Sequence, residues 1–130
     1  MVPQDLRFTQ HHIWCRLEQD GTVTLGATEY ALRSVGDIIY VDLPDVDDDV
    51  LIEVPFGEIE GVDGVHDLLS PFDGVVRKVN AENVYDPDRI LEDPYGQGWL
   101  ISLQPEKPPS LDNLLSASDY EQLVKKKRKR

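Results

Sequence analysis

Residues 36–44 read Gly-Asp-Ile-Ile-Tyr-Val-Asp-Leu-Pro, an apolar run of β-branched and aromatic residues between a glycine and a proline. Such a run between turn-forming residues is typical of a β-strand, and we predict a buried strand over residues 37–43. Upstream, Thr28 can accept hydrogen bonds from the first amides of a helix, and Gly36 can end that helix. A short helix is therefore expected near residues 28–35.

Short apolar runs separated by Gly, Pro and Asp continue on both sides of this segment and predict a mainly β domain. Asp20-Gly21 lies between two such runs and is a hairpin signal. The acidic run Asp45–Asp49 lacks the glycine and the closing glutamate of a calcium loop, so we expect a solvated loop there. Turns are expected at residues 61–64, 70–74 and 93–98. Strands are expected at residues 12–17, 22–26, 37–43, 50–60, 65–69, 75–80 and 99–103.

The hydrophobic period changes near the C-terminus. Tyr120, Leu123 and Val124 recur at helical spacing, and the segment Ser118-Asp119-Tyr120-Glu121 fits a capping box. We therefore predict a helix from about residue 117 into the basic end of the chain, with its apolar face packed on the sheet.

The charge of the chain is unevenly distributed. The net charge is −12 over 130 residues, yet residues 125–130 are all basic. Without these six, residues 1–124 hold 7 basic against 25 acidic residues, a net charge of −18. We expect a single domain over residues 1–124 and a basic tail over residues 125–130. The acidic body favours basic partners and disfavours nucleic acid and anionic membranes.

The chain lacks the signals of export and of membrane insertion. No run of about 18 apolar residues is present, and the first residues contain neither a basic n-region nor an apolar h-region. Cys15 is the only cysteine, so no internal disulfide can form, and we expect a small buried thiol in a reducing, cytoplasmic setting.

Six blocks of residues, in order along the chain, carry a resemblance to a known family. They are Phe8-Thr9 with His12 and Trp14; Leu25-Gly26-Ala27-Thr28 with Tyr30-Ala31; Gly36–Pro44; Ser70-Pro71 with Gly74 and Val79-Asn80; Asp93–Gly96 with Gly98-Trp99-Leu100; and Leu114-Leu115-Ser116 with Tyr120. Together they make the chain similar to the H protein of the glycine cleavage system over about residues 8–124.

The resemblance implies the fold of that family, a barrel-sandwich hybrid of the lipoyl or biotinyl type. It also implies a function that depends on one lysine at a hairpin tip, in a Glu-Ser-Val-Lys-Ala block. Lipoate is attached to this lysine through an amide, and the arm carries an aminomethyl group between partner enzymes. The sequence itself shows no nucleophile with a positioned base, no phosphate-binding loop and no metal-ligand spacing, so we expect that the chain is not an enzyme.

The chain departs from the family at this tip. Aligned backwards from Ser70-Pro71 without gaps, Glu60 matches the family glutamate, and Asp63 falls at the position of the lipoyl lysine. There is no lysine between residues 50 and 77. A carboxylate cannot form the amide, so we expect no lipoate and no other cofactor.

A second departure concerns the cleft that shelters the loaded arm in the family. The resemblance places Ile13 at the position of a cleft glutamate, where a carboxylate could pair with an amine but an isoleucine cannot. Asp67 matches a second cleft acid of the family, which is compatible with a structural role.

We expect the hairpin surface for partner contact to comprise Glu60, Gly61, Val62, Asp63, Gly64, His66 and Asp67. The acids and His66 suggest a metal site as an alternative, but alternation along strands would place them on two faces. His11 and His12 are adjacent and would point to opposite faces of a strand, which makes a poor chelate. No metal site is therefore expected.

Three functions follow from these observations. The first is a non-lipoylated interaction, scaffold or regulatory module that binds protein partners, among them glycine cleavage or lipoylation enzymes. The second is an active aminomethyl carrier with an unexpected attachment site. The third is nucleic-acid binding through the basic tail, which the charge of the body opposes. We expect a monomer, since no long apolar interface stripe is present.

Overall fold

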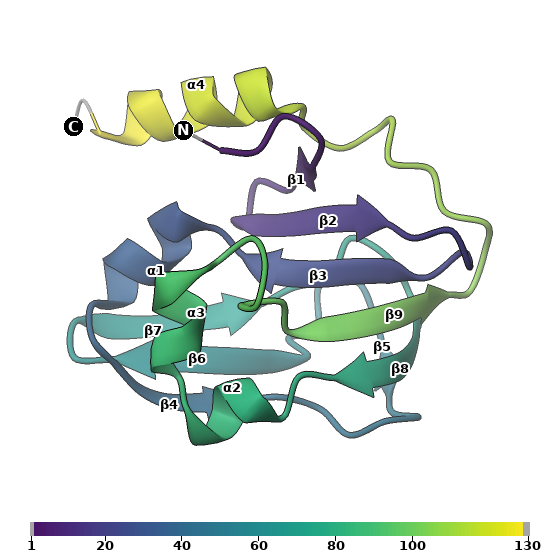
Figure 1. Ribbon diagram of the computed structural model, residues 1–130. Helices are drawn as coiled ribbons and strands as arrows, with labels where there is room; N and C mark the ends of the chain where they lie inside the picture. Colours follow the sequence, from purple (N-terminus) through teal and green to yellow (C-terminus); the bar gives the residue numbers. More distant parts are fainter. Residues whose placement is uncertain (1, 129–130) are drawn as a thin grey trace.

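The computed structural model describes residues 2–128 and consists of two antiparallel sheets with helices at their margins (Figure 1). The strands are β1 (Arg7–Phe8), β2 (Ile13–Leu17), β3 (Val23–Ala27), β4 (Ile38–Asp42), β5 (Asp49–Val50), β6 (Gly57–Gly61), β7 (Gly64–Leu68), β8 (Gly74–Val79) and β9 (Ile101–Pro105). The helices are α1 (Glu29–Val35), α2 (Glu82–Tyr85), α3 (Asp88–Glu92) and α4 (Ala117–Arg128). Among the described residues, one sheet has the order β1-β2-β3-β9-β8-β5 and the other the order β4-β6-β7.

The predicted hairpin around Asp20-Gly21 is confirmed as β2 and β3, paired from Ile13 opposite Ala27 to Leu17 opposite Val23. Gly21 has a φ of 86°, a conformation that glycine adopts without steric cost. The Asp20 carboxylate accepts hydrogen bonds from the backbone N–H and the hydroxyl of Thr22, which close the turn.

The predicted short helix is confirmed as α1. The Thr28 hydroxyl accepts a hydrogen bond from the backbone N–H of Ala31 at 3.3 Å. Gly36 ends the helix with a φ of 73° and a ψ of −152°, a region that is essentially restricted to glycine. Local capping chemistry therefore sets both ends of this helix.

The prediction of a buried strand over residues 37–43 is right about the strand and wrong about its burial. β4 lies at the edge of its sheet, and Ile39 and Tyr40 are exposed to 61% and 50%. A register shift between Ile38 and Tyr40 marks a bulge that adds a residue to the strand. Val41 alone on this strand is fully buried, because only one face of the sheet meets the core.

The predicted strand over residues 50–60 is also too long. Within this range, only the parts that belong to β5 and β6 are strands. The segment between them forms an exposed turn that contains Leu51, Ile52 and Val54. The Asp73 carboxylate accepts a hydrogen bond of 2.8 Å from the backbone N–H of Ile52, which joins the turn to the loop before β8 instead of to a strand. The acidic loop is a loop over residues 45–48, with Asp49 already in β5.

Two short helices, α2 and α3, occur where no helix was predicted. Neither has a side-chain hydrogen bond at its N-terminus, so the capping signal that marks α1 is missing from both. The buried residues Asn83 and Ile90 hold them in place: the Asn83 amide donates to the carbonyl oxygen of Trp99, and Ile90 belongs to the core.

The predicted C-terminal helix is confirmed as α4, although its cap differs. The Ser116 hydroxyl accepts a hydrogen bond from the backbone N–H of Asp119 at 3.2 Å, whereas Ser118 lies inside the helix. The capping-box pattern was therefore assigned two residues too late. The part of the basic tail at residues 129–130 lies outside the described residues.

The core has two parts. The larger cluster fills the space between the sheets, and the smaller one lies under α4. In the smaller cluster, the rings of Phe8 and Tyr120 stack with centroids 4.7 Å apart. The Trp14 indole N–H donates to the carbonyl oxygen of Pro94 at 3.0 Å, and its ring covers Gly26 so closely that a side chain there would clash. No helix of residues 2–128 is long and apolar enough to cross a membrane.

Candidate functional site

The hairpin of β6 and β7 reverses at Val62 and Asp63, directly after the pair formed by Gly61 and Gly64. Neither turn residue has a positive φ, although tight hairpins favour turns that require it. Two hydrogen bonds from outside the hairpin hold the turn: the N–H of Val62 donates to the carbonyl oxygen of Asp37 at 2.9 Å, and the N–H of Asp63 donates to that of Val35 at 2.8 Å. The tip is therefore attached to the end of α1.

The Asp63 side chain is exposed and lies against Gly36. A side chain at Gly36 would place its Cβ 2.5 Å from Asp63 Oδ2 and 3.1 Å from Val62 Cγ2. A side chain at Gly61 would meet the carbonyl oxygen of Val35. The two glycines thus permit the close approach of the tip to α1.

The structure divides the predicted hairpin residues between two faces, as the alternation along strands predicted. Ile59 and His66 are paired and face inward, and Ile59 is 1% exposed. Glu60 and Asp67 are exposed on the outer face. Within residues 2–128, no group of three or more His, Cys, Asp or Glu side chains is placed to hold a metal ion.

His12 belongs to a buried hydrogen-bond network that was not predicted from the sequence. His12 precedes β2 in a turn with a φ of 66°, and its ring is buried against Tyr30. Its Nδ1 shares a hydrogen bond of 2.8 Å with the Tyr120 hydroxyl, which in turn lies 2.7 Å from the Thr28 hydroxyl. No local pattern could reveal this network, since His12 and Tyr120 are far apart in the sequence.

His66 extends from the hairpin towards the same region, with its ring centroid 6.3 Å from that of His12. Burial, followed by the charges of Lys127, His66 and His11, lowers the pKa of His12 to about 4. Burial is also the largest cause that lowers the pKa of His66. His66 Nε2 is buried and has no hydrogen-bond partner among the described residues. Both rings are therefore neutral near pH 7.

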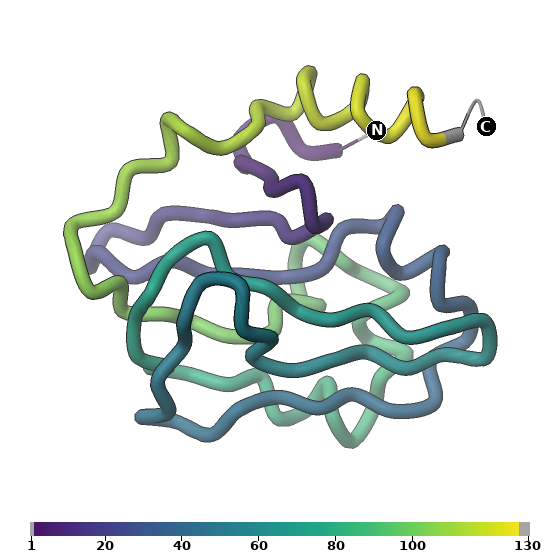
Figure 2. Tube along the Cα trace, turned by 180° about the vertical axis from the view of Figure 1, so that it is seen from behind, coloured from purple at the N-terminus to yellow at the C-terminus, as the bar shows by residue number. Residues whose placement is uncertain are grey.

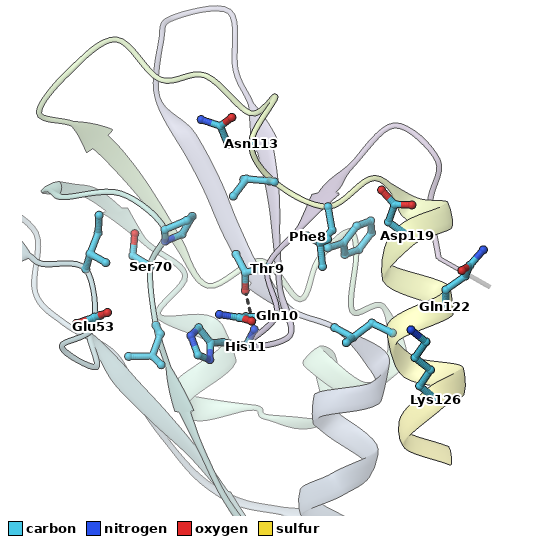
Figure 3. A pocket seen from close by; sticks show the side chains of 16 residues that line it. Phe8, Thr9, Gln10, His11, Glu53, Ser70, Asn113, Asp119, Gln122 and Lys126 are labelled. Atoms are coloured by element: carbon cyan, nitrogen blue, oxygen red, sulfur yellow. Dashed lines mark hydrogen bonds between the residues drawn. The ribbon is translucent and has the colours of Figure 1, made fainter. Parts of the chain in front are cut away.

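A groove of about 620 Å³ lies between the N-terminal segment, the loops before β6 and after β7, and α4 (Figure 3). Leu69, Pro71 and Leu123 form part of its apolar lining, and Asp119 and Lys126 from α4 stand at its rim. Figure 3 shows His11 and Glu53 pointing towards the same space. None of the lining residues comes from the tip of the hairpin. The groove could hold an apolar group, but no nucleophile paired with a base lines it.

Comparison with known proteins assigns the chain to a family. The family model described as Glycine cleavage H-protein matches residues 6–127. The chain belongs to the glycine cleavage H-protein family. The match covers the whole of both sheets and nearly all of α4, so it includes the candidate site.

Individual relatives agree with this assignment. The chain is 43% identical over 123 residues to a glycine cleavage system H protein of Opitutus terrae, which covers 95% of this chain and 97% of the relative. It is 41% identical over 120 residues to one from a Psychrobacter species, with 92% and 95% covered. A crystal structure of a glycine cleavage system H protein from Mycobacterium marinum superposes with a TM-score of 0.85 at 36% identity, and covers 95% of this chain and 99% of that one.

This membership confirms the predicted barrel-sandwich hybrid fold. The H-protein family is one of carriers, so the chain is not an enzyme, as predicted.

The hairpin of this H-protein family member offers no amine for lipoate. β6 and β7 and the turn between them contain no lysine, and the exposed tip residue is Asp63. The lysines of the described chain are Lys78 on β8, Lys107 after β9 and Lys125–Lys127 on α4. Because the amide requires a primary amine, the hairpin does not fit lipoate. That Asp63 stands at the family's lipoyl position stays a prediction from the resemblance.

Ile13, which the resemblance places at the family's cleft glutamate, lies in the apolar core. Its side chain is fully buried and belongs to the larger cluster with Leu25 and Ile59. An ionised carboxylate at such a position would be costly to bury without a partner. In this chain, the position contributes to packing and lines no open cleft.

Proposed function

We propose that this member of the glycine cleavage H-protein family acts as a non-lipoylated interaction, scaffold or regulatory module. The observation that carries the proposal is the hairpin tip itself. It is exposed and attached to α1, it presents the Asp63 carboxylate, and the hairpin contains no lysine to which lipoate could be attached. Such a protein would offer the shape of an H protein to its partners without transferring a group.

The attachment of the tip supports an interaction role. Two backbone hydrogen bonds and two closely packed glycines fix Val62 and Asp63 against α1. A fixed surface loses little conformational entropy when a partner binds. We propose that the module is a cytoplasmic monomer and that its partners are glycine cleavage or lipoylation enzymes. They would contact the hairpin through Glu60, Val62, Asp63 and Asp67.

The test is lipoylation followed by intact-mass measurement. The purified chain is incubated with lipoate, ATP and a lipoate ligase, beside its Asp63→Lys variant and a lipoylatable H protein. We expect the wild type to stay unmodified and Asp63→Lys to gain one lipoyl group. Asp63→Lys is expected to fold because the Asp63 side chain is exposed.

Glu60→Lys is the matched control, since it adds a lysine to the same hairpin away from the tip. It should stay unmodified. A lipoyl group on the wild type would overturn the proposal and favour the carrier function, with the modified lysine found by peptide mapping. If Asp63→Lys stays unmodified while the lipoylatable H protein is modified, the placement of Asp63 at the lipoyl position is wrong.

A further inference from the structure

A smaller cavity, of about 240 Å³, lies between the N-terminal segment, α1, the loop before β9 and α4. Its lining includes three tyrosines, Tyr30, Tyr95 and Tyr120, and two valines, Val2 and Val124. We call it the tyrosine cavity. Figure 2 shows the N-terminal segment beside α4, as Figure 1 does from the opposite side. None of the lining residues belongs to the hairpin of β6 and β7, so the cavity is separate from the surface proposed for partner contact.

Contacts outside the cavity hold the three rings in place. The Tyr30 ring packs against His12, with the ring centroids 4.5 Å apart. The Tyr95 hydroxyl accepts a hydrogen bond of 3.0 Å from the backbone N–H of Glu29. Tyr120 is only 1% exposed, so it forms the floor of the cavity. Rings that are already fixed lose little conformational entropy when a ligand binds.

The interior of the cavity offers ring faces and methyl groups to a ligand. Two of the three tyrosine hydroxyls already have partners, because that of Tyr95 accepts from Glu29 and that of Tyr120 lies 2.8 Å from His12 Nδ1. The face of a tyrosine ring attracts cations through its negative potential. A primary ammonium group has three N–H donors and is strongly hydrated, whereas a trimethylated one has no N–H to satisfy. The cavity therefore favours methylated ammonium groups.

Carboxylates at the cavity add to the attraction for a cation. Glu29 and Glu121 both line it. Burial is the largest cause that raises the pKa of the Tyr95 hydroxyl, and the negative charges of these two glutamates act in the same direction. Glu29 pairs with Arg33, whereas Glu121 forms no ion pair with a described residue. Lys125 also lines the cavity, and its side chain is exposed. Glu121 is therefore the carboxylate that a bound cation would neutralise.

We infer that the tyrosine cavity binds a methylated ammonium group, with Tyr30 and Tyr95 against its methyl groups and the Glu121 carboxylate near its charge. The cavity is smaller than the pockets of about 300–1,000 Å³ that hold drug-sized ligands, so it suits a group such as trimethylammonium. The group belongs either to a free quaternary ammonium compound or to a trimethylated lysine of a partner protein. This binding goes beyond the proposed interaction function and does not depend on the hairpin.

The first experiment compares three probes in NMR titrations of the full chain. They are choline, its primary ammonium analogue ethanolamine, and the neutral alcohol in which a tert-butyl group replaces the trimethylammonium group. We expect choline to bind saturably and the other two at least about fivefold more weakly. Equal affinity for the neutral alcohol would overturn the inference, because the charge would then play no part. Equal affinity for ethanolamine would overturn it too, as would the absence of saturation by about 50 mM choline.

Variants of Tyr95 test the contribution of the ring. Tyr95→Leu removes the ring but keeps an apolar side chain, and it should weaken choline binding at least about fivefold. Tyr95→Phe keeps the ring and loses only the hydroxyl, so it should retain the affinity within about twofold. Tyr85→Leu is the matched control, at a tyrosine that is 88% exposed outside the cavity, and it should have no effect. Equal affinity of Tyr95→Leu and Tyr95→Phe would contradict recognition by the ring.

Variants of the charged residues test the contribution of the carboxylate without disturbing the rings. Glu121→Gln should weaken choline binding at least about threefold, and Lys125→Gln should strengthen it, because the first removes an attracting charge and the second a repelling one. Glu106→Gln, at an exposed acid outside the cavity, is the control for net charge. Equal effects of Glu121→Gln and Glu106→Gln would overturn the placement of the cation. Thermal unfolding of each variant confirms that it is folded at the temperature of the titration.

A peptide with a single trimethyl-lysine distinguishes the two sources of the group. If it binds more tightly than choline, the ligand is the side chain of a partner protein, and if it binds more weakly, the ligand is a free compound. Both results support recognition of a methylated ammonium group. The same peptide with an unmodified lysine should not compete with choline, and equal competition by the two peptides would overturn the inference. Lipoylation of the wild type would overturn the proposed function and leave this inference standing.

Discussion

Asp63 donates its backbone N–H to the carbonyl oxygen of Val35 at 2.8 Å, and this bond joins the tip of one hairpin to the C-terminal end of α1. The bond requires the backbone to pass close to Gly36, which has no Cβ to obstruct it. The geometry of the tip therefore depends on a helix that ends at the right residue, in the conformation that only glycine adopts easily.

The first prediction concerns this contact. Gly36→Ala should lower the free energy of unfolding by at least about 2 kcal/mol, because it combines an unfavourable φ with a clash against Asp63. Gly21→Ala is the control, since Gly21 also has a positive φ but has nothing within 4 Å of the added Cβ. It should cost about 1 kcal/mol. Denaturant unfolding measures both values, and equal losses would show that the clash is relieved.

The second prediction concerns the buried hydroxyl of Tyr120. Tyr120→Phe keeps the ring stacked on Phe8 but removes the hydroxyl between His12 and Thr28. It should lower the free energy of unfolding by about 1–3 kcal/mol, because buried polar groups lose a partner. Tyr85→Phe, at a residue 88% exposed, should change it by less than about 0.5 kcal/mol. Similar small effects in the two variants would mean that the network contributes little to stability.

The third prediction is a loss of stability in acid. The pKa of His12 is lowered to about 4 in the folded protein, mainly by burial, and its ordinary value is 6.5. The unfolded chain therefore binds a proton more readily, so the stabilising contribution is present above about pH 6.5 and is lost as the pH falls towards 4. The pKa of His66 is lowered in the same direction, chiefly by burial.

His12→Asn tests this pH dependence, because asparagine tolerates the positive φ of His12 and does not titrate. Denaturant unfolding measures the free energy of unfolding at pH values between 7 and 4. Its decrease over this range should be smaller in the variant than in the wild type, by an amount on the order of 2 kcal/mol. An identical pH dependence in the wild type and the variant would exclude His12 as a source of the loss of stability in acid.

The fourth prediction concerns the single thiol. Cys15 is fully buried in the core, and burial raises the pKa of its thiol. A thiol-specific reagent should therefore react with the folded protein only as fast as the core around Cys15 opens. It should react promptly with the protein unfolded in guanidinium chloride. Rapid reaction of the folded chain would show that β2 opens readily.

Much of the fold could be predicted from the sequence because its signals are local. Thr28 and Gly36 set the two ends of α1 through contacts within one turn of the helix. Asp20-Gly21 closes a hairpin through hydrogen bonds between residues that are close in the sequence. The errors have a common cause. The apolar run of β4 and that of residues 51–56 resemble buried strands, but strand burial depends on which face meets the core, and no short window contains that information.

The sequence by itself determined the turns, the capped helix and the absence of a lysine from the hairpin, since each depends on neighbouring residues or on residue identity alone. Only the tertiary structure decided that Asp63 is joined to Val35, that the rings of His12 and His66 lie near each other, and that acids from three strands form one row. These contacts join residues far apart in the chain. They exist only once the register of the strands and the docking of α1 and α4 are set together.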